Sequence, residues 1–159
     1  MSVRPTTDAG KECLFNILSN HFSLATTSFL DLFAGTGNIS YEAASRGCED
    51  VIAVDQQYKC TGFIKSTASD LDMEGLQVVR SDAYAYLQRV NRTFDIIFAD
   101  PPYMSPETAD VHQIVFERNL LNKGGFLIIE HGNDEKFAHL PHLKDTREIG
   151  NVNFTIFNV

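Results

Sequence analysis

Two hydrophobic patterns alternate along most of the chain. Short apolar runs, typical of strands that are buried on both faces, occur at 28–35, 51–55, 77–80, 95–100 and 125–130. Apolar residues at helical spacing predict helices over 8–22, 38–46, 57–71, 83–90 and 107–121. This alternation of strand and helix is typical of parallel βαβ units, so we expect a doubly wound α/β sheet with helices on both faces.

The C-terminal stretch has a different pattern. Two strand-like runs, KDTREIG and NFTIFNV, are joined at Gly150-Asn151, a dipeptide suited to a tight hairpin turn. The series of βα units should therefore end in an antiparallel β-hairpin. No repeat or linker divides the chain, and we expect one domain over residues 1–159.

Composition narrows the class of protein. With 159 residues, 43% of them hydrophobic, the chain can bury a full core without disulfides or structural metal. The three cysteines, Cys13, Cys48 and Cys60, are scattered and are interpreted as reduced packing residues. No signal peptide is recognisable, and no run approaches the roughly 20 apolar residues that cross a bilayer. We expect a cytoplasmic protein, with a monomer favoured, that does not act on membranes.

The charge balance bears on possible partners. The formal charge of −8 counts against nucleic-acid binding, which relies on Lys and Arg to neutralise phosphates. A local basic face remains an alternative to ordinary solvated surface. Its candidate residues are Arg4, Lys11, Arg80, Arg89, Arg92, Arg118, Lys123, Lys144 and Arg147.

A glycine turn follows the first buried strand. In DLFAGTGNIS, Gly35 and Gly37 stand where the strand gives way to a helix, so backbone N–H groups can approach a ligand closely. Ser40 takes the place of the third glycine of the dinucleotide fingerprint. The motif alone indicates a cofactor turn or merely a tight turn.

Two aspartates follow the next two strands. Asp55 ends the second strand about 20 residues beyond the glycine turn, where a carboxylate can accept both hydroxyl hydrogens of a ribose. Asp82 follows the third strand on the same edge of the sheet and is placed to meet an adenine amino group. Each aspartate alone could instead be a helix cap or a solvated loop residue. Together with the glycine turn they favour an adenosine-bearing ligand.

The tetrapeptide DPPY, residues 100–103, ends the fourth strand. Its two prolines fix the backbone and leave carbonyls as acceptors, while Asp100 adds a carboxylate and Tyr103 an aromatic face. An exocyclic amine is a poor nucleophile, and acceptors for its two hydrogens would orient its nitrogen toward a sulfonium methyl and stabilise the developing charge. Tyr103 would stack on an unpaired or flipped base. The alternative is a stiff exit from the strand into a loop, with Tyr103 in the core.

Several other interpretations remain open or are weak. His139 and His142 do not form a metal pair, because Pro141 lies between them and no nearby acidic cluster completes a site, so no metal is expected. A nicotinamide dehydrogenase would leave DPPY unexplained. Enzymes that methylate adenine N6 in DNA or glutamine N5 in proteins hold the target amine with loops similar to DPPY. The chemistry of the loop alone therefore does not identify the acceptor. A noncatalytic nucleic-acid-binding module that retains the fold is a further alternative.

The order FAGTG, Asp55, SDA and DPPY resembles the class I methyltransferases of the amino-methylating branch. Within that branch, the opening RPTTDAGKECLFNIL, with its RPT and LFN motifs, resembles the bacterial small-subunit (16S) ribosomal RNA guanine-N2 methyltransferases. The resemblance covers essentially the whole chain. It implies a Rossmann-like, mostly parallel seven-stranded sheet with a reversed last strand, S-adenosyl-L-methionine as cofactor, and ribosomal RNA or the small ribosomal subunit as partner.

The resemblance also implies roles for individual residues, which fall into three groups. The expected cofactor-binding residues are Asp31, Phe33, Gly35, Gly37, Asn38, Asp55, Gln56, Asp82 and Ala83; the expected catalytic residues are Asp100, Pro101, Pro102 and Tyr103; and the expected substrate-binding residues are Arg4, Thr6 and Tyr103. Family members usually carry a basic β-hairpin ahead of RPT. Here residues 1–3 precede Arg4, and Ala9 takes a place often held by a basic residue, so we expect this hairpin to be missing.

Overall fold

The computed structural model describes residues 7–102, 108–132, 137, 139–149 and 152–159. Its helices are α1 (Asp8–His21), η1 (Leu24–Thr26, a short 3₁₀ turn), α2 (Asn38–Ser45), α3 (Tyr58–Asp70), α4 (Ala83–Arg89) and α5 (Thr108–Glu117). Its strands are β1 (Ser28–Leu32), β2 (Asp50–Asp55), β3 (Leu76–Arg80), β4 (Phe94–Ala99), β5 (Leu121–His131), β6 (Leu143–Ile149) and β7 (Val152–Asn158).

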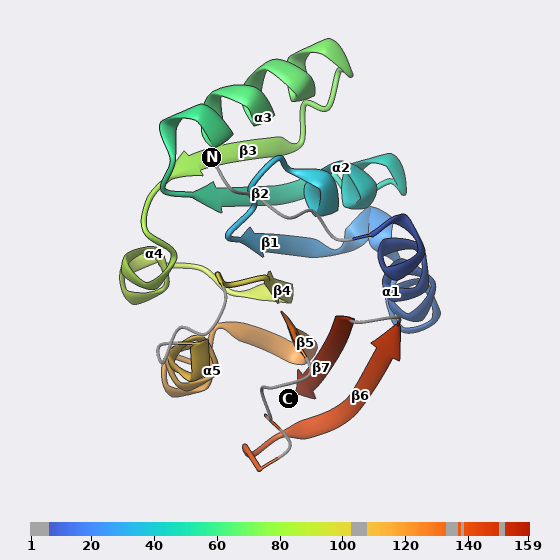
Figure 1. The fold of residues 1–159 in the computed structure, drawn as a ribbon, viewed down its shortest axis with the longest axis vertical. Coiled ribbons are helices and arrows are strands. Elements are labelled where there is room, and N and C mark those ends of the chain that lie inside the picture. The colour runs from blue at the N-terminus through green and yellow to red at the C-terminus, as the bar shows by residue number, and fades with distance from the viewer. Residues whose placement is uncertain (1–6, 103–107, 133–136, 138, 150–151) are drawn as a thin grey trace.

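The seven strands form one sheet in the order β3-β2-β1-β4-β5-β7-β6. Strands β1 to β5 pair in parallel, whereas β7 runs antiparallel to both β5 and β6. The predicted α/β sheet and C-terminal hairpin are therefore confirmed, although the predicted turn at Gly150-Asn151 lies outside the described residues. The arrowheads of β1, β2 and β3 point the same way in Figure 1.

Helices cover both faces of the sheet, as predicted (Figure 1). On one face, α1, α2 and α3 pack residues such as Phe15, Ile39 and Ile64 against alternate strand residues. On the other face, α4 and α5 bury Leu87 and Val115 against the strand residues between them. The central strands are apolar on both sides because each face is covered, which explains their continuous apolar runs.

The helix predicted over 107–121 ends earlier than expected. It ends at Glu117, and Leu121 is the first residue of β5, so the prediction was wrong at its C-terminal end. Asn119 adopts a left-handed φ of 53°, while the N–H of Leu120 bonds the carbonyl of Val115 and that of Asn119 bonds Phe116. This pattern is a Schellman cap, which ends a helix and redirects the chain.

Among the described residues, no helix is both long and apolar enough to cross a membrane. Cys48 and Cys60 are buried and free, and Cys13 is free and half-buried, in agreement with their interpretation as reduced packing residues.

Gly75, just before β3, lies against the backbone of the loop that precedes β2. A Cβ at this position would lie 2.2 Å from the carbonyl oxygen of Glu49. We expect Gly75→Ala to lower the free energy of unfolding by about 1–3 kcal/mol, because the backbone itself must shift. In the exposed Gly62 of α3 a Cβ meets no atom within 4 Å, so Gly62→Ala should raise stability by about 0.5–1 kcal/mol. Urea unfolding of both variants checks the contrast, and equal effects would contradict it.

Candidate functional site

The carboxyl ends of the parallel strands meet at one edge of the sheet. Leu32, the last residue of β1, pairs with Val54 of β2 on one side and with Ala99 of β4 on the other. Phe33 and Asp100, which follow β1 and β4, therefore lie with Asp55, the last residue of β2, at three neighbouring strand ends. The chain reverses its winding direction between β1 and β4, which is where open α/β sheets bind ligands.

The turn after β1 contains three left-handed residues at alternate positions: Phe33 with φ 58°, Gly35 with φ 59° and Gly37 with φ 86°. The Ala34 N–H donates to the Val54 carbonyl at 3.0 Å, which attaches the turn to β2. The strand predicted over 28–35 therefore ends at Leu32, because a left-handed residue cannot continue a strand. Gly37 is the N-cap of α2.

Asp55 is attached to this turn through its carboxylate. Its Oδ2 accepts the Gly35 N–H at 2.9 Å, and its Oδ1 accepts the Gln57 N–H at 2.9 Å. A carboxylate oxygen accepts about two hydrogen bonds, so the two N–H groups leave acceptor capacity on the carboxylate, which the Cys60 side chain also contacts. The half-buried carboxylate is thus fixed in orientation and keeps acceptor capacity for a ligand.

The residues after β2 and β3 lie at the same edge. Asp82 is the N-cap of α4, and its Oδ2 accepts the Ala85 N–H at 2.9 Å. The helix-cap alternative for Asp82 is therefore confirmed, and an exposed carboxylate can still accept a ligand hydrogen. Ala83 is buried beneath it, while Gln56 is exposed and its carbonyl accepts from the Arg80 guanidinium at 3.4 Å.

Asp31 lies beneath the turn. The residue is only 2% exposed, and its Oδ2 accepts the hydroxyl hydrogen of the fully buried Ser40 at 2.6 Å. This contact joins the middle of β1 to the first turn of α2. Burial raises the pKa of Asp31 to about 7, and the Ser40 hydrogen bonds lower it only in part.

Stability should depend on pH through Asp31. Because its folded pKa of about 7 exceeds the ordinary value of 3.8, its stabilising contribution is full at low pH and is lost as the pH rises through the folded value. Relative to Asp31→Asn, the wild type should lose about 2–3 kcal/mol of unfolding free energy between pH 5 and pH 7. Urea unfolding at both pH values measures this loss. The exposed Asp70→Asn serves as control, and a pH-independent difference between wild type and Asp31→Asn would contradict the prediction.

The DPPY residues are only partly described. Asp100 and Pro101 are half-buried and Pro102 is exposed, directly after β4. Tyr103, expected to stack on a base, lies outside the described residues, as do Arg4 and Thr6, the other expected substrate contacts. The structure thus brings the expected cofactor residues and Asp100 to one edge.

Three contacts near the turn were not predicted from the sequence. Lys11 of α1 donates from Nζ to the Asn38 Oδ1 at 3.0 Å, and Asn38 is the first residue of α2. Ser40 was noted only as a replacement for glycine, not as the donor to Asp31. Tyr84 of α4 packs against Phe33 at a ring-centroid distance of 5.7 Å. Each contact depends on how a helix packs against another element, so periodicity carries no signal of it.

Several candidate basic residues have partners within the protein. Arg92 forms a bidentate pair with Asp50, with nitrogen–oxygen distances of 3.1 and 2.6 Å. Arg147 pairs with Asp145 at 2.6 Å, and Arg118 donates to the carbonyls of Leu87 and Val90.

Within the described part of the chain, no cluster of three or more His, Cys, Asp or Glu side chains is arranged to hold a metal ion.

Known proteins share this architecture. The structure superposes on protein TTHA0928 of Thermus thermophilus with a TM-score of 0.87 at 25% identity, over 99% of this chain and 90% of that one. An RNA methyltransferase from Salinibacter ruber in complex with S-adenosyl-L-homocysteine has the same fold, with a TM-score of 0.77 at 12% identity over 97% and 92% of the two chains. The sheet order, the reversed β7 and the turn after β1 define the class I methyltransferase fold.

Proteins that are similar in sequence lead to the same class, the methyltransferases. The family described as "Conserved hypothetical protein 95" matches residues 1–158, and the chain belongs to that family. YlbH of Bacillus subtilis (strain 168) is 36% identical over 137 residues, which cover 84% of this chain and 73% of that protein. "Ribosomal RNA small subunit methyltransferase D" of Buchnera aphidicola subsp. Baizongia pistaciae is 30% identical over 132 residues, 83% of this chain and 67% of its own length.

Proposed function

We propose that this protein transfers a methyl group from S-adenosyl-L-methionine to the exocyclic N2 amine of a guanine in small-subunit ribosomal RNA. The observation that carries the proposal is the convergence of the turn after β1, Asp55 and Asp100 at three neighbouring strand ends. Asp55, the proposed ribose contact, and Asp100, the proposed amine contact, thus lie at the ends of β2 and β4, with β1 between these strands. Relatives named ribosomal RNA small subunit methyltransferase D support the RNA substrate.

The residues present fit the proposed cofactor. The Asp55 carboxylate would accept the ribose hydroxyls, with the Cys60 side chain giving way, while it keeps its backbone partners Gly35 and Gln57. Gly35 and Gln56 would lie along the same ligand, and Asp82 would accept from the adenine amino group. The neighbour with bound S-adenosyl-L-homocysteine shares the fold. When bound, the cofactor supplies an electrophilic methyl group on its sulfonium.

The DPPY residues would act on the guanine. Asp100 and the Pro101 carbonyl would accept the two hydrogens of the amine and so aim its lone pair away from the ring. The carboxylate would also stabilise the positive charge that develops on this nitrogen. Pro102 would stiffen the loop, and Tyr103 would stack on the base outside the helix of the RNA.

The proposed partner is ribosomal RNA, free or within the small ribosomal subunit, and Arg4 and Thr6 would lie near the site entrance. We expect the protein to act as a cytoplasmic monomer. The location follows from the proposed substrate, since ribosomal RNA is modified where ribosomes are made. A monomer is expected because one chain contains every proposed residue.

Transfer of tritium from methyl-labelled cofactor tests the acceptor class. Small subunits from a strain that lacks the gene, the naked RNA of those subunits, duplex DNA and a glutamine-containing release factor are offered in parallel. Label in the small-subunit RNA, either naked or assembled, supports the proposal. Label only in DNA or only in protein would instead identify that molecule as the substrate. No label in any acceptor would favour a noncatalytic module.

A further inference from the structure

An aromatic residue holds a backbone conformation in which glycine would be unstrained. Phe33, Gly35 and Gly37 are all left-handed, yet only the first of them carries a Cβ and a ring. A positive φ at a bulky residue is strained, and such strain persists only where surrounding contacts enforce it. The structure should therefore contain contacts that hold Phe33.

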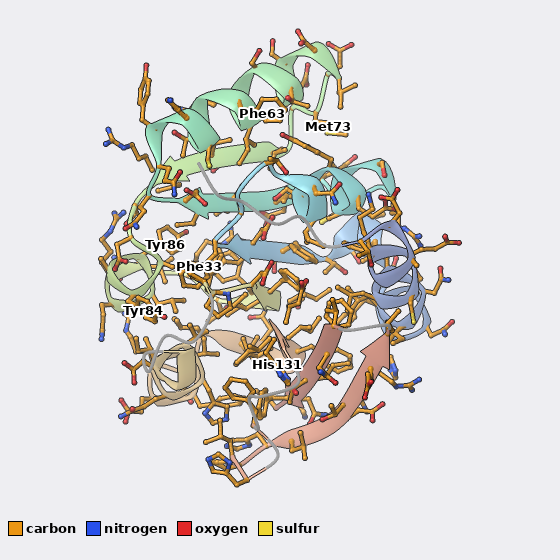
Figure 2. All side chains as sticks on the ribbon, in the orientation of Figure 1. Phe33, Phe63, Met73, Tyr84, Tyr86 and His131 are labelled. Carbon is orange, nitrogen blue, oxygen red and sulfur yellow. The ribbon has the colours of Figure 1, made fainter. Side chains whose placement is uncertain are left out.

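Tyr84 makes such a contact with Phe33. The two rings meet edge to face, with centroids 5.7 Å apart and planes at 67°. Both side chains are half-buried and pack against the core between α4, α5 and the sheet. Figure 2 shows Phe33 and Tyr84 together at the α4 side of the sheet. Aromatic pairs of this geometry stabilise beyond the area that they bury.

Tyr84 itself is held in place. It is the second residue of α4, and the helix starts at the Asp82 cap through the Ala85 N–H. The next residues along the chain from Phe33 are Ala34, whose N–H bonds the Val54 carbonyl, and Gly35, whose N–H bonds Asp55. A continuous series of contacts thus joins the start of α4 to the Asp55 carboxylate.

We propose that Tyr84 is a positioning residue for cofactor binding, which holds Phe33 left-handed and thereby places the Gly35 N–H against Asp55. The inference rests on the proposed function, because Asp55 is the proposed ribose contact. Tyr84 acts through its ring, and the variant that keeps the ring should behave as the wild type does.

Calorimetric titration of S-adenosyl-L-homocysteine measures the effect. Tyr84→Ala should weaken binding about tenfold, and Tyr84→Phe should bind as the wild type does. Tyr86→Ala is the matched control, since Tyr86 is a buried tyrosine of the same helix whose ring neighbour is Arg89. It should lower the melting temperature and leave the affinity unchanged.

A double-mutant cycle distinguishes positioning from general loss of stability. Glycine adopts a positive φ unaided, so Tyr84→Ala should cost no further affinity in a Phe33→Gly background. Phe33→Gly should also melt above Phe33→Ala, which keeps the strain. The inference is overturned if Tyr84→Ala binds normally, if Tyr86→Ala weakens binding equally, or if Tyr84→Ala costs the same in both backgrounds. Absence of binding by the wild type would instead defeat the proposed function.

Discussion

Asp55→Ala is expected to weaken binding of the proposed cofactor at least about 100-fold. Two charge-assisted hydrogen bonds to the ribose would be lost, each of about 1.5–3 kcal/mol. The same change removes the acceptor of the Gly35 N–H at 2.9 Å and so releases the turn that approaches the ligand. Both effects act on the ground state, so the loss should appear in the dissociation constant.

Calorimetry with S-adenosyl-L-methionine and its demethylated product measures this loss. Asp55→Asn keeps one oxygen as an acceptor and should fall between the wild type and Asp55→Ala. The control is Asp70→Ala, an exposed aspartate at the C-terminal end of α3, which should bind normally. Unchanged affinity in Asp55→Ala would contradict the assignment of this carboxylate to the cofactor.

Asp100→Ala should abolish most methyl transfer, by about a thousandfold in kcat, and leave cofactor affinity within a few-fold of the wild type. The carboxylate is proposed to orient the amine and to stabilise charge that appears only in the transition state, and loss of one such group costs about 10²–10³ in rate. Loss of the amine's orientation adds to this cost. An interaction made only in the transition state lowers kcat without raising the dissociation constant of the cofactor.

Single-turnover assays on small-subunit RNA separate the two quantities. Asp100→Asn keeps an acceptor oxygen and should retain more activity than Asp100→Ala. Equal loss of cofactor affinity and rate in Asp100→Ala would place this residue in cofactor binding instead, and full activity would remove it from the mechanism.

The sequence was sufficient for the architecture because the strands are buried on both faces. Their continuous apolar runs and the amphipathic helices between them predicted the layers, and Gly150-Asn151 indicated the hairpin. The boundary near Leu121 was predicted wrongly because the apolar pattern of α5 continues into β5. The left-handed Asn119 between them marks the change, and this conformation is not encoded in a hydrophobic pattern.

The candidate site was predictable only in part. Residues that follow strands, such as Asp55 and Asp100, could be placed at one edge because parallel strands share a direction. The contact of Asp31 with Ser40 and that of Phe33 with Tyr84 depend on how helices pack on each face. Such side-chain contacts between separate elements require the three-dimensional structure.

The nature of the methylated nucleoside tests the central proposal most directly. Small subunits from a strain that lacks the gene are incubated with the protein and S-adenosyl-L-methionine, and their RNA is digested to nucleosides and analysed by mass spectrometry. We predict a gain of N2-methylguanosine that requires Asp100. A gain of N6-methyladenosine, or no methylated nucleoside while the protein binds its cofactor, would contradict the proposal.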